Sequence, residues 1–169
     1  MFVRVKKAKS RTYAYLVENE WTPWGSRQRV TKYLGKLVSL QRTKNEAHEM
    51  PNGFKETILS AVEQELHNHG FTNNKQDNIL VNVEQGVIVD AGKKVVLGMN
   101  EGYLCDHTLH QLLVFTPAEN PNENANKLAN LAVEAGLKLT NEQFLHLFEQ
   151  VNKRYKGAEI PDQPHGKSP

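Results

Sequence analysis

The sequence has few of the features that mark secreted and membrane proteins. Its 169 residues include a single cysteine, Cys105, which rules out an internal disulfide and is typical of a reducing compartment. No apolar run approaches the roughly 20 residues that a membrane-spanning helix needs. The first residues, MFVRVKKAKS, also lack the apolar stretch of a secretory signal peptide. These absences predict a soluble, cytoplasmic protein with no membrane partner.

Acidic residues are scarce in the first quarter of the chain. Residues 1–44 contain 11 lysines and arginines but only two acids, Glu18 and Glu20, so this segment has a net charge of +9. The rest of the chain has a net charge of −7, which leaves +2 overall. Such asymmetry indicates a polyanionic partner for the cationic segment. The alternatives are that this segment docks on the acidic part or only aids solubility.

Alternation with a period of two predicts three short strands within residues 1–40. The runs FVRVKKA and RTYAYLVENE are separated by AKS, which is typical of a hairpin. WTPWGS then predicts a turn, and RQRVTKYL predicts a third strand that Gly35 ends. Three consecutive short strands indicate a small antiparallel meander.

The same alternation divides this sheet into two faces. We expect one aliphatic face to be buried: Val3, Val5, Ala14, Leu16, Val30 and Leu34. The cationic and aromatic residues of the segment are the predicted nucleic-acid-binding residues: Arg4, Lys6, Arg11, Tyr13, Tyr15, Arg27, Arg29, Tyr33 and Lys36. Of these, Lys36 is expected just beyond the third strand, whereas Lys32 is expected on the opposite parity. A register slip of one residue would turn a whole strand over.

Cations and tyrosines in this pattern suit nucleic acid. Lysine and arginine neutralise phosphates and release counterions, and arginine can read guanine edges in the major groove of DNA. Tyrosines can stack on unpaired bases, as in RNA and single-strand binders. The pattern favours a DNA-binding protein, with an RNA- or ribosome-associated factor as the alternative. Trp21 and Trp24, in the second turn, either contact the nucleic acid or fold back over their own sheet.

Residues 1–40 also resemble the N-terminal region of DDE-type insertion-sequence transposases. The resemblance rests on a YxYLVE-like strand and an RQRVxKYLGKL-like strand: Tyr13, Tyr15, Leu16, Val17 and Glu18, then Arg27, Gln28, Arg29, Val30, Lys32, Tyr33, Leu34 and Gly35. It implies a segment that contacts DNA and precedes a catalytic domain in that family. The rest of the chain does not share the resemblance.

Catalytic and metal-binding patterns are weak in the remaining residues. A DDE catalytic domain places three acids around two metal ions, and Asp77, Asp90 and Asp106 match these only by residue type; we expect them in a loop, a turn and a helix cap. The histidines near Cys105 lack the paired spacing of a zinc site. We therefore expect no enzymatic activity, metal or cofactor. A transposase-derived or metal-dependent nuclease-like protein is the alternative.

The pattern changes after residue 40. Residues 41–52 are predicted to form a linker, residues 53–155 an acidic module, and residues 156–169 a mobile tail. In the module, residues 79–99 predict two or three short strands broken at Gly86 and at residues 91–92. The chain is thus predicted to have an α+β fold, in which a basic three-stranded sheet precedes a short β group and about four helices.

Four helices are predicted in the acidic module. An apolar stripe predicts the first: Phe54, Ile58, Val62 and Leu66, with Gly70 after its end. The others cover residues 106–115, 124–135 and the segment that begins at Thr140, where Gln143 completes a capping box. We expect residues 53–155 to form a homodimer or to bind a protein partner. A protein-interaction module without nucleic-acid binding remains a further alternative.

Overall fold

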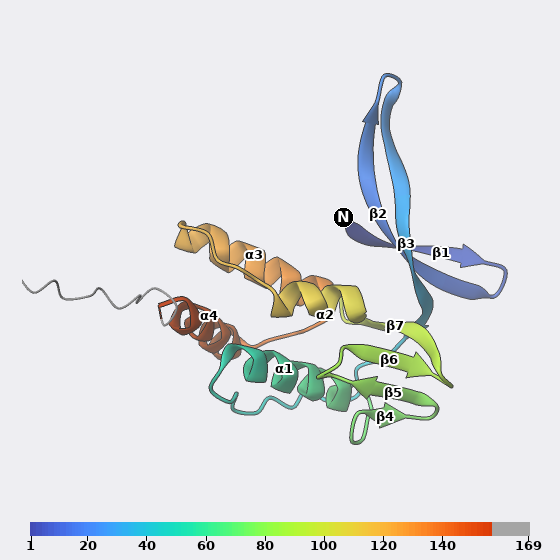
Figure 1. The fold of residues 1–169 in the computed structure, drawn as a ribbon. Helices are drawn as coiled ribbons and strands as arrows, with labels where there is room; N and C mark the ends of the chain where they lie inside the picture. Colours follow the sequence, from blue (N-terminus) through green and yellow to red (C-terminus); the bar gives the residue numbers. More distant parts are fainter. Residues whose placement is uncertain (157–169) are drawn as a thin grey trace, which may run out of the picture.

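The computed structural model describes residues 1–156 of the chain (Figure 1). It confirms the α+β class: three antiparallel strands are followed by one helix, a mixed group of short strands and three further helices. The mobile tail predicted for residues 156–169 lies outside the described residues, apart from Lys156, which is the last residue of the final helix. No helix of the described part is both long enough and apolar enough to cross a membrane.

The predicted meander is present and is longer than expected. Strands β1 (Phe2–Ala8), β2 (Arg11–Thr22) and β3 (Gly25–Ser39) pair antiparallel in sequence order. The far ends of β2 and β3 project as a long hairpin away from the helices (Figure 1). We call this projecting hairpin, residues 18–30, the arm.

The prediction that Gly35 ends the third strand was wrong. β3 continues to Ser39, and its residues 36–39 pair in parallel with residues 95–98 of β7. Gly35 has a φ of 139°, and a side chain there would place its Cβ 2.6 Å from the carbonyl oxygen of Lys94. The glycine therefore lets two backbones approach closely where the meander joins the rest of the sheet.

The sheet is continuous from the basic meander into the acidic part. Its remaining strands are β4 (Lys75–Gln76), β5 (Ile79–Asn82), β6 (Val87–Asp90), β7 (Lys93–Met99) and β8 (Gly102–Leu104). The order is β1-β2-β3-β7-β6-β5-β4, and β8 pairs with β7. The two or three short strands predicted in residues 79–99 are present as β5, β6 and β7. The two-residue β4 and three-residue β8 are too short for a periodic pattern, and neither was predicted.

Four helices pack beside the strands: α1 (Phe54–Asn68), α2 (Asp106–Leu113), α3 (Pro121–Glu134) and α4 (Asn141–Lys156). The predicted stripe of α1 is buried throughout, and Gly70 follows its end with a φ of 93°. The capping box of α4 is also confirmed, because the amide of Gln143 donates to Thr140 Oγ1 at 3.1 Å and the amide of Thr140 donates to Gln143 Oε1 at 3.2 Å.

Two helix starts differ from the prediction. α3 begins at Pro121 rather than at residue 124, because the side chain of Asn120 caps the amides of Asn122 and Glu123. α2 has Cys105 as its N-cap, and Asp106 is the first helical residue instead of the cap.

Two apolar clusters stabilise the fold. The larger one lies among the four helices and strands β5 to β8. The smaller one lies beneath the basic meander and joins Ala14, Leu16 and Leu34 to Val96 and Cys105. The aliphatic face of the meander is thus buried by the same sheet and loop that lead into α2.

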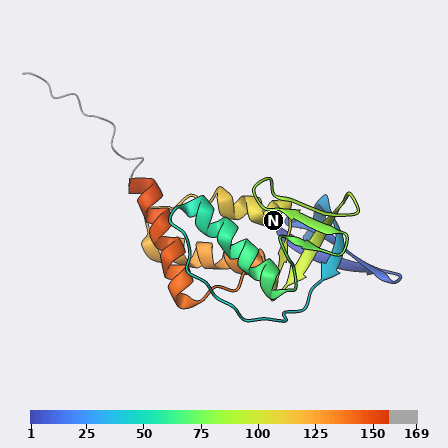
Figure 2. The same cartoon turned by 90° about the horizontal axis from the view of Figure 1, so that it is seen from below.

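The segment of residues 41–52 has no regular secondary structure, but it is fixed along α1. It runs beside α1 towards α4 (Figure 2). The amides of Thr43 and Glu46 donate to the backbone and side-chain oxygens of Asn68, at 2.8 and 3.1 Å. Gln143 of α4 donates to the carbonyl of His48 at 2.9 Å. We call this segment the strap.

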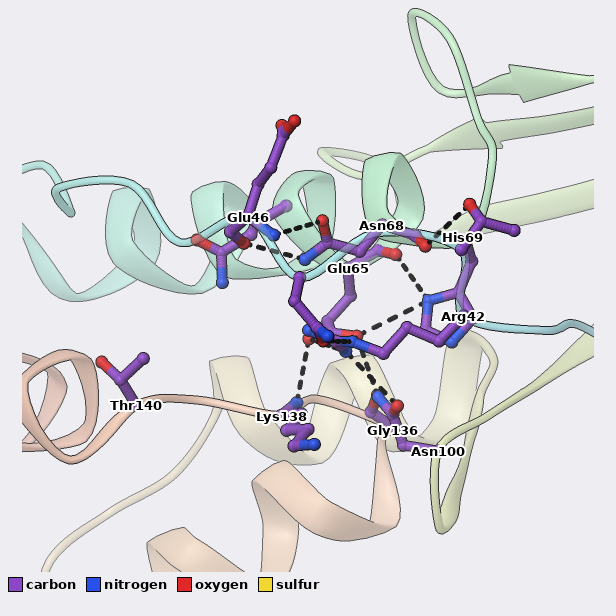
Figure 3. A network of polar contacts seen from close by, with 12 residues as sticks. Arg42, Glu46, Glu65, Asn68, His69, Asn100, Gly136, Lys138 and Thr140 are labelled. Atoms are coloured by element: carbon purple, nitrogen blue, oxygen red, sulfur yellow. Dashed lines mark hydrogen bonds and ion pairs between the residues drawn. The ribbon is translucent and has the colours of Figure 1, made fainter.

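A buried carboxylate anchors the start of the strap. The side chain of Glu65 is fully buried in α1 and accepts a hydrogen bond from Arg42 Nη1 at 2.8 Å (Figure 3). Asn100 Nδ2 donates to the same carboxylate at 2.8 Å, and the amide of Lys138 donates to it at 3.3 Å. One carboxylate on α1 therefore connects three other segments: the strap, the β7–β8 turn and the α3–α4 loop.

Candidate nucleic-acid interface

Two bulges in β3 decide which side chains of the meander lie together. Tyr15 is opposite Tyr33 and Leu16 is opposite Lys32, but Ala14 is opposite Gly35 and Val17 is opposite Val30. β3 thus contributes one extra residue at Leu34 and another at Thr31, and each bulge reverses the alternation of β3 relative to β2. Because the pairing of β1 with β2 is regular, all parity changes lie in β3.

Seven of the nine predicted binding residues share one face of this sheet. Opposite residues in antiparallel strands lie on the same face, and the register pairs Arg4 with Tyr15, Lys6 with Tyr13 and Tyr13 with Lys36. We call the face formed by the following residues the basic-aromatic face: Arg4, Lys6, Arg11, Tyr13, Tyr15, Tyr33 and Lys36. Lys36 belongs to β3 and to this face, so its expected place beyond the strand was wrong.

The other two predicted residues lie on the opposite face. Arg29 is opposite Glu18, and Arg27 is opposite Glu20. Arg29 Nε donates to Glu18 Oε1 at 2.9 Å, and this hydrogen bond and the charge of Glu18 raise the pKa of Arg29. The expectation that both arginines share a face with Tyr13 and Tyr15 was wrong, because the bulge at Thr31 intervenes. Val30 is likewise not on the buried aliphatic face, and 44% of it is exposed.

The cations of the basic-aromatic face are exposed and have no carboxylate partner within residues 1–156. The four side chains are Arg4, Lys6, Arg11 and Lys36. The two acids of the first 44 residues, Glu18 and Glu20, lie on the other face with Arg29 and Arg27. Alternation and the bulges therefore separate the negative charges of the meander from this positive surface.

The tyrosines form a cluster in the middle of the cations. The ring centroid of Tyr33 lies 5.4 Å from that of Tyr15 and 6.3 Å from that of Tyr13. Lys6 Nζ lies 5.7 Å from the centroid of Tyr15, within reach of a cation–π interaction. Partial burial in this cluster, together with the neighbouring Tyr13 and Tyr15, raises the pKa of Tyr33. Partly exposed or exposed tyrosine rings and cations therefore share one surface of the sheet.

Lys32 lies on the other face, as predicted. Its Nζ is 3.4 Å from Asp106 Oδ2, and Lys94 Nζ is 3.3 Å from the same atom. Partial burial opposes ionisation of Asp106, but the charges of Lys32 and Lys94 hold its pKa below the usual value. This carboxylate therefore joins β3, β7 and the start of α2.

The candidate metal ligands do not gather in the described part of the chain. No group of three histidines, cysteines or acids that could hold a metal ion lies within residues 1–156. Asp77 lies in a loop with a φ of 50°, and Asp90 ends β6 opposite Lys93, rather than lying in a turn. Burial raises the pKa of the Cys105 thiol, which leaves it a poor nucleophile.

The two tryptophans project from the tip of the arm. Trp21 is 85% exposed and Trp24 is 86% exposed, so neither folds back over the sheet. The tip is closed by the pairing of Thr22 with Gly25, and Thr22 Oγ1 donates to the carbonyl of Gly25 at 2.7 Å. β2 carries no inserted residue, so the even spacing from Tyr13 and Tyr15 places Trp21 on the same face of β2.

No sequence pattern predicted the network around Glu65. The apolar stripe of α1 shows one buried face, but Gln64, Glu65 and Asn68 are buried as well because the strap covers them. A charged residue in a helix is normally read as exposed. Only the distant partners Arg42 and Asn100 reveal that Glu65 is interior.

Comparisons with known proteins give no further assignment: no family model matches the sequence, and neither a curated protein nor a solved structure matches it.

Proposed function

We propose that this protein binds duplex DNA through the basic-aromatic face of its N-terminal sheet. One observation carries the proposal: within residues 1–156, the register brings four exposed cations without carboxylate partners and three clustered tyrosines to a single face and places both nearby acids on the other. Phosphate neutralisation by such cations drives binding that does not depend on base sequence. A small sheet of this width can also lie in the major groove.

The proposal assigns unequal roles to the predicted binding residues. Arg4, Lys6, Arg11 and Lys36 contact phosphates or base edges, and the tyrosines pack against sugars or bases beside them. Arg27 and Arg29 contribute less, because Glu20 and Glu18 compensate their charge within the arm. The resemblance of residues 1–40 to the DNA-contacting region of DDE-type transposases supports DNA over RNA.

The proposal includes no catalysis. Asp106 is engaged by two lysines, whereas Asp77 and Asp90 belong to separate turns and strands. The buried Cys105 suits the cytoplasm, where we place the protein.

The acidic part is proposed to mediate assembly with a second copy of the chain. Leu145 on α4 is 60% exposed and Val133 on α3 is 46% exposed, whereas the other apolar side chains of both helices are buried or partly buried. A dimer would present two basic-aromatic faces to one longer DNA site.

The experiment compares labelled duplex DNA, single-stranded DNA and structured RNA at two salt concentrations, with fluorescence anisotropy as the readout. We expect the full chain to bind duplex DNA most tightly and to lose affinity steeply as salt rises. Tighter binding to structured RNA would replace the proposal with the RNA-factor alternative. No binding to any of the three at low salt would leave a protein-interaction module.

A further inference from the structure

The arm differs from the rest of the meander in its charge. Within residues 18–30, Glu18 and Glu20 balance Arg27 and Arg29, so the arm has no net charge. Its most exposed large hydrophobic side chains are the two indoles at the tip. Because the arm has no net charge, it would release few counterions on binding DNA. Attraction to phosphates is therefore not the contribution that the arm makes to binding.

Two exposed tryptophans on a projecting hairpin are costly to leave in water. Each indole has a large apolar surface, and its exposure gains nothing for the stability of the isolated fold. The hydrogen bond of Thr22 to Gly25 and the ion pair of Arg29 with Glu18 hold the tip in a defined shape. The indoles are therefore presented on an ordered support rather than on a loose loop.

The position of the tip relative to the basic-aromatic face sets its reach. Trp21 continues the face of β2 that carries Tyr13 and Tyr15. Trp21 follows Tyr15 by six positions, and an extended strand of that length spans roughly 20 Å. On B-form DNA this distance corresponds to about six base pairs. A duplex that runs parallel to β2 on the basic-aromatic face passes within reach of the indoles.

We propose that Trp21 and Trp24 form an aromatic wedge that stacks on exposed bases of the bound DNA, at a distorted or unpaired step. This inference rests on the proposed function, because the basic-aromatic face supplies the affinity and the wedge supplies selectivity for deformed DNA. Apolar side chains that enter a base step unstack it and are accommodated most easily where the duplex is already weakened. The wedge therefore prefers DNA that contains a mispaired or missing base.

The two tryptophans of the chain are both at the tip, so intrinsic fluorescence reports on the wedge in the unmodified protein. The probes are a labelled mixed-sequence duplex and an identical duplex with one abasic site. Anisotropy of the label measures binding, and tryptophan emission measures stacking. We expect emission to be quenched as the abasic duplex saturates the protein, together with roughly fivefold or greater preference for that duplex.

Variants separate the wedge from the basic-aromatic face. The W21A/W24A variant should lose the preference for the abasic duplex and keep the salt dependence of the wild-type protein. The W21F/W24F variant, which retains aromatic rings, should keep a clear preference. Lys36→Ala serves as the control: it should weaken binding to both duplexes equally and leave the preference unchanged.

The possible outcomes separate failure of the wedge from failure of the proposed DNA binding. Binding by anisotropy without quenching of tryptophan emission would overturn the wedge and leave the proposed function intact. Equal losses of affinity for both duplexes in W21A/W24A would overturn it as well, because the tip would then contact only the backbone. Absence of any anisotropy change at low salt would reject the proposed function, and the wedge with it.

Discussion

At the scale of single residues, the ion pair of Arg42 with Glu65 fixes the strap to α1. Glu65 is fully buried, and the side chain of Arg42 is 20% exposed, so this ion pair is shielded from water on most sides. Asn100 and the amide of Lys138 complete the hydrogen bonds of the carboxylate (Figure 3). A buried carboxylate that loses its cation retains the cost of its desolvation.

Arg42→Ala should therefore lower the free energy of unfolding by about 3–5 kcal/mol. Urea denaturation followed by circular dichroism measures the change. The matched control is Lys127→Ala, which removes an exposed ion pair with Glu123 on α3 and should cost at most about 1 kcal/mol. Similar small losses for both variants would show that the interior of the protein does not depend on the Glu65 network.

At the scale of elements, β3 joins the two parts of the molecule. Its first half pairs antiparallel with β2, and its last residues pair in parallel with β7. Gly35 lies at the transition, where a Cβ would meet the carbonyl of Lys94. The bulges on either side of Tyr33 place that ring on the basic-aromatic face while Leu34 stays buried.

Gly35→Ala should destabilise the fold by about 2 kcal/mol or more, because a forced positive φ is added to a backbone clash. Gly25→Ala is the control, since Gly25 has a φ of 116° but a methyl group added there would meet nothing within 4 Å. Thermal unfolding of the two variants should show the larger loss for Gly35→Ala. Equal losses of stability in the two variants would mean that glycine is needed at position 35 only for its positive φ, and not because β7 lies so close.

The element scale also shows how far the sequence could predict the fold. The capping box of Thr140 and Gln143 and the stripe of α1 are local patterns, and both were predicted correctly. The bulges at Thr31 and Leu34 depend on pairing between strands, which alternation within one strand does not reveal. The parallel pairing of β3 with β7 is likewise a contact between segments far apart in the chain.

The same limit explains the outcome for the candidate site. The residue types were chosen from composition and alternation, and seven of them do lie on one face. Arg27 and Arg29 were placed on the wrong face because the Thr31 bulge reverses parity between Tyr33 and Arg29. Their partners, Glu18 and Glu20, were visible in the sequence, but their position opposite the arginines follows only from the register.

At the scale of the whole molecule, charge is divided between two parts that share one sheet. The basic-aromatic face lies on the meander, and residues 45–169 carry 17 of the 19 acidic residues. In the proposed function, repulsion of DNA by the acidic part favours an orientation in which only the meander approaches the duplex. The arm projects away from the helices (Figure 1), so the acidic part does not cover it.

The most direct test of the central claim is the salt dependence of duplex DNA binding by two charge-matched variants. One variant replaces Arg4, Lys6, Arg11 and Lys36 by alanine, and the other replaces four exposed lysines elsewhere: Lys44, Lys55, Lys138 and Lys153. Each neutralised phosphate contact contributes about 0.9 to the slope of log affinity against log salt. The first variant should lose roughly three to four units of slope, and the second should lose less than about one. Equal slopes for both variants would show that net charge, and not the basic-aromatic face, attracts the DNA.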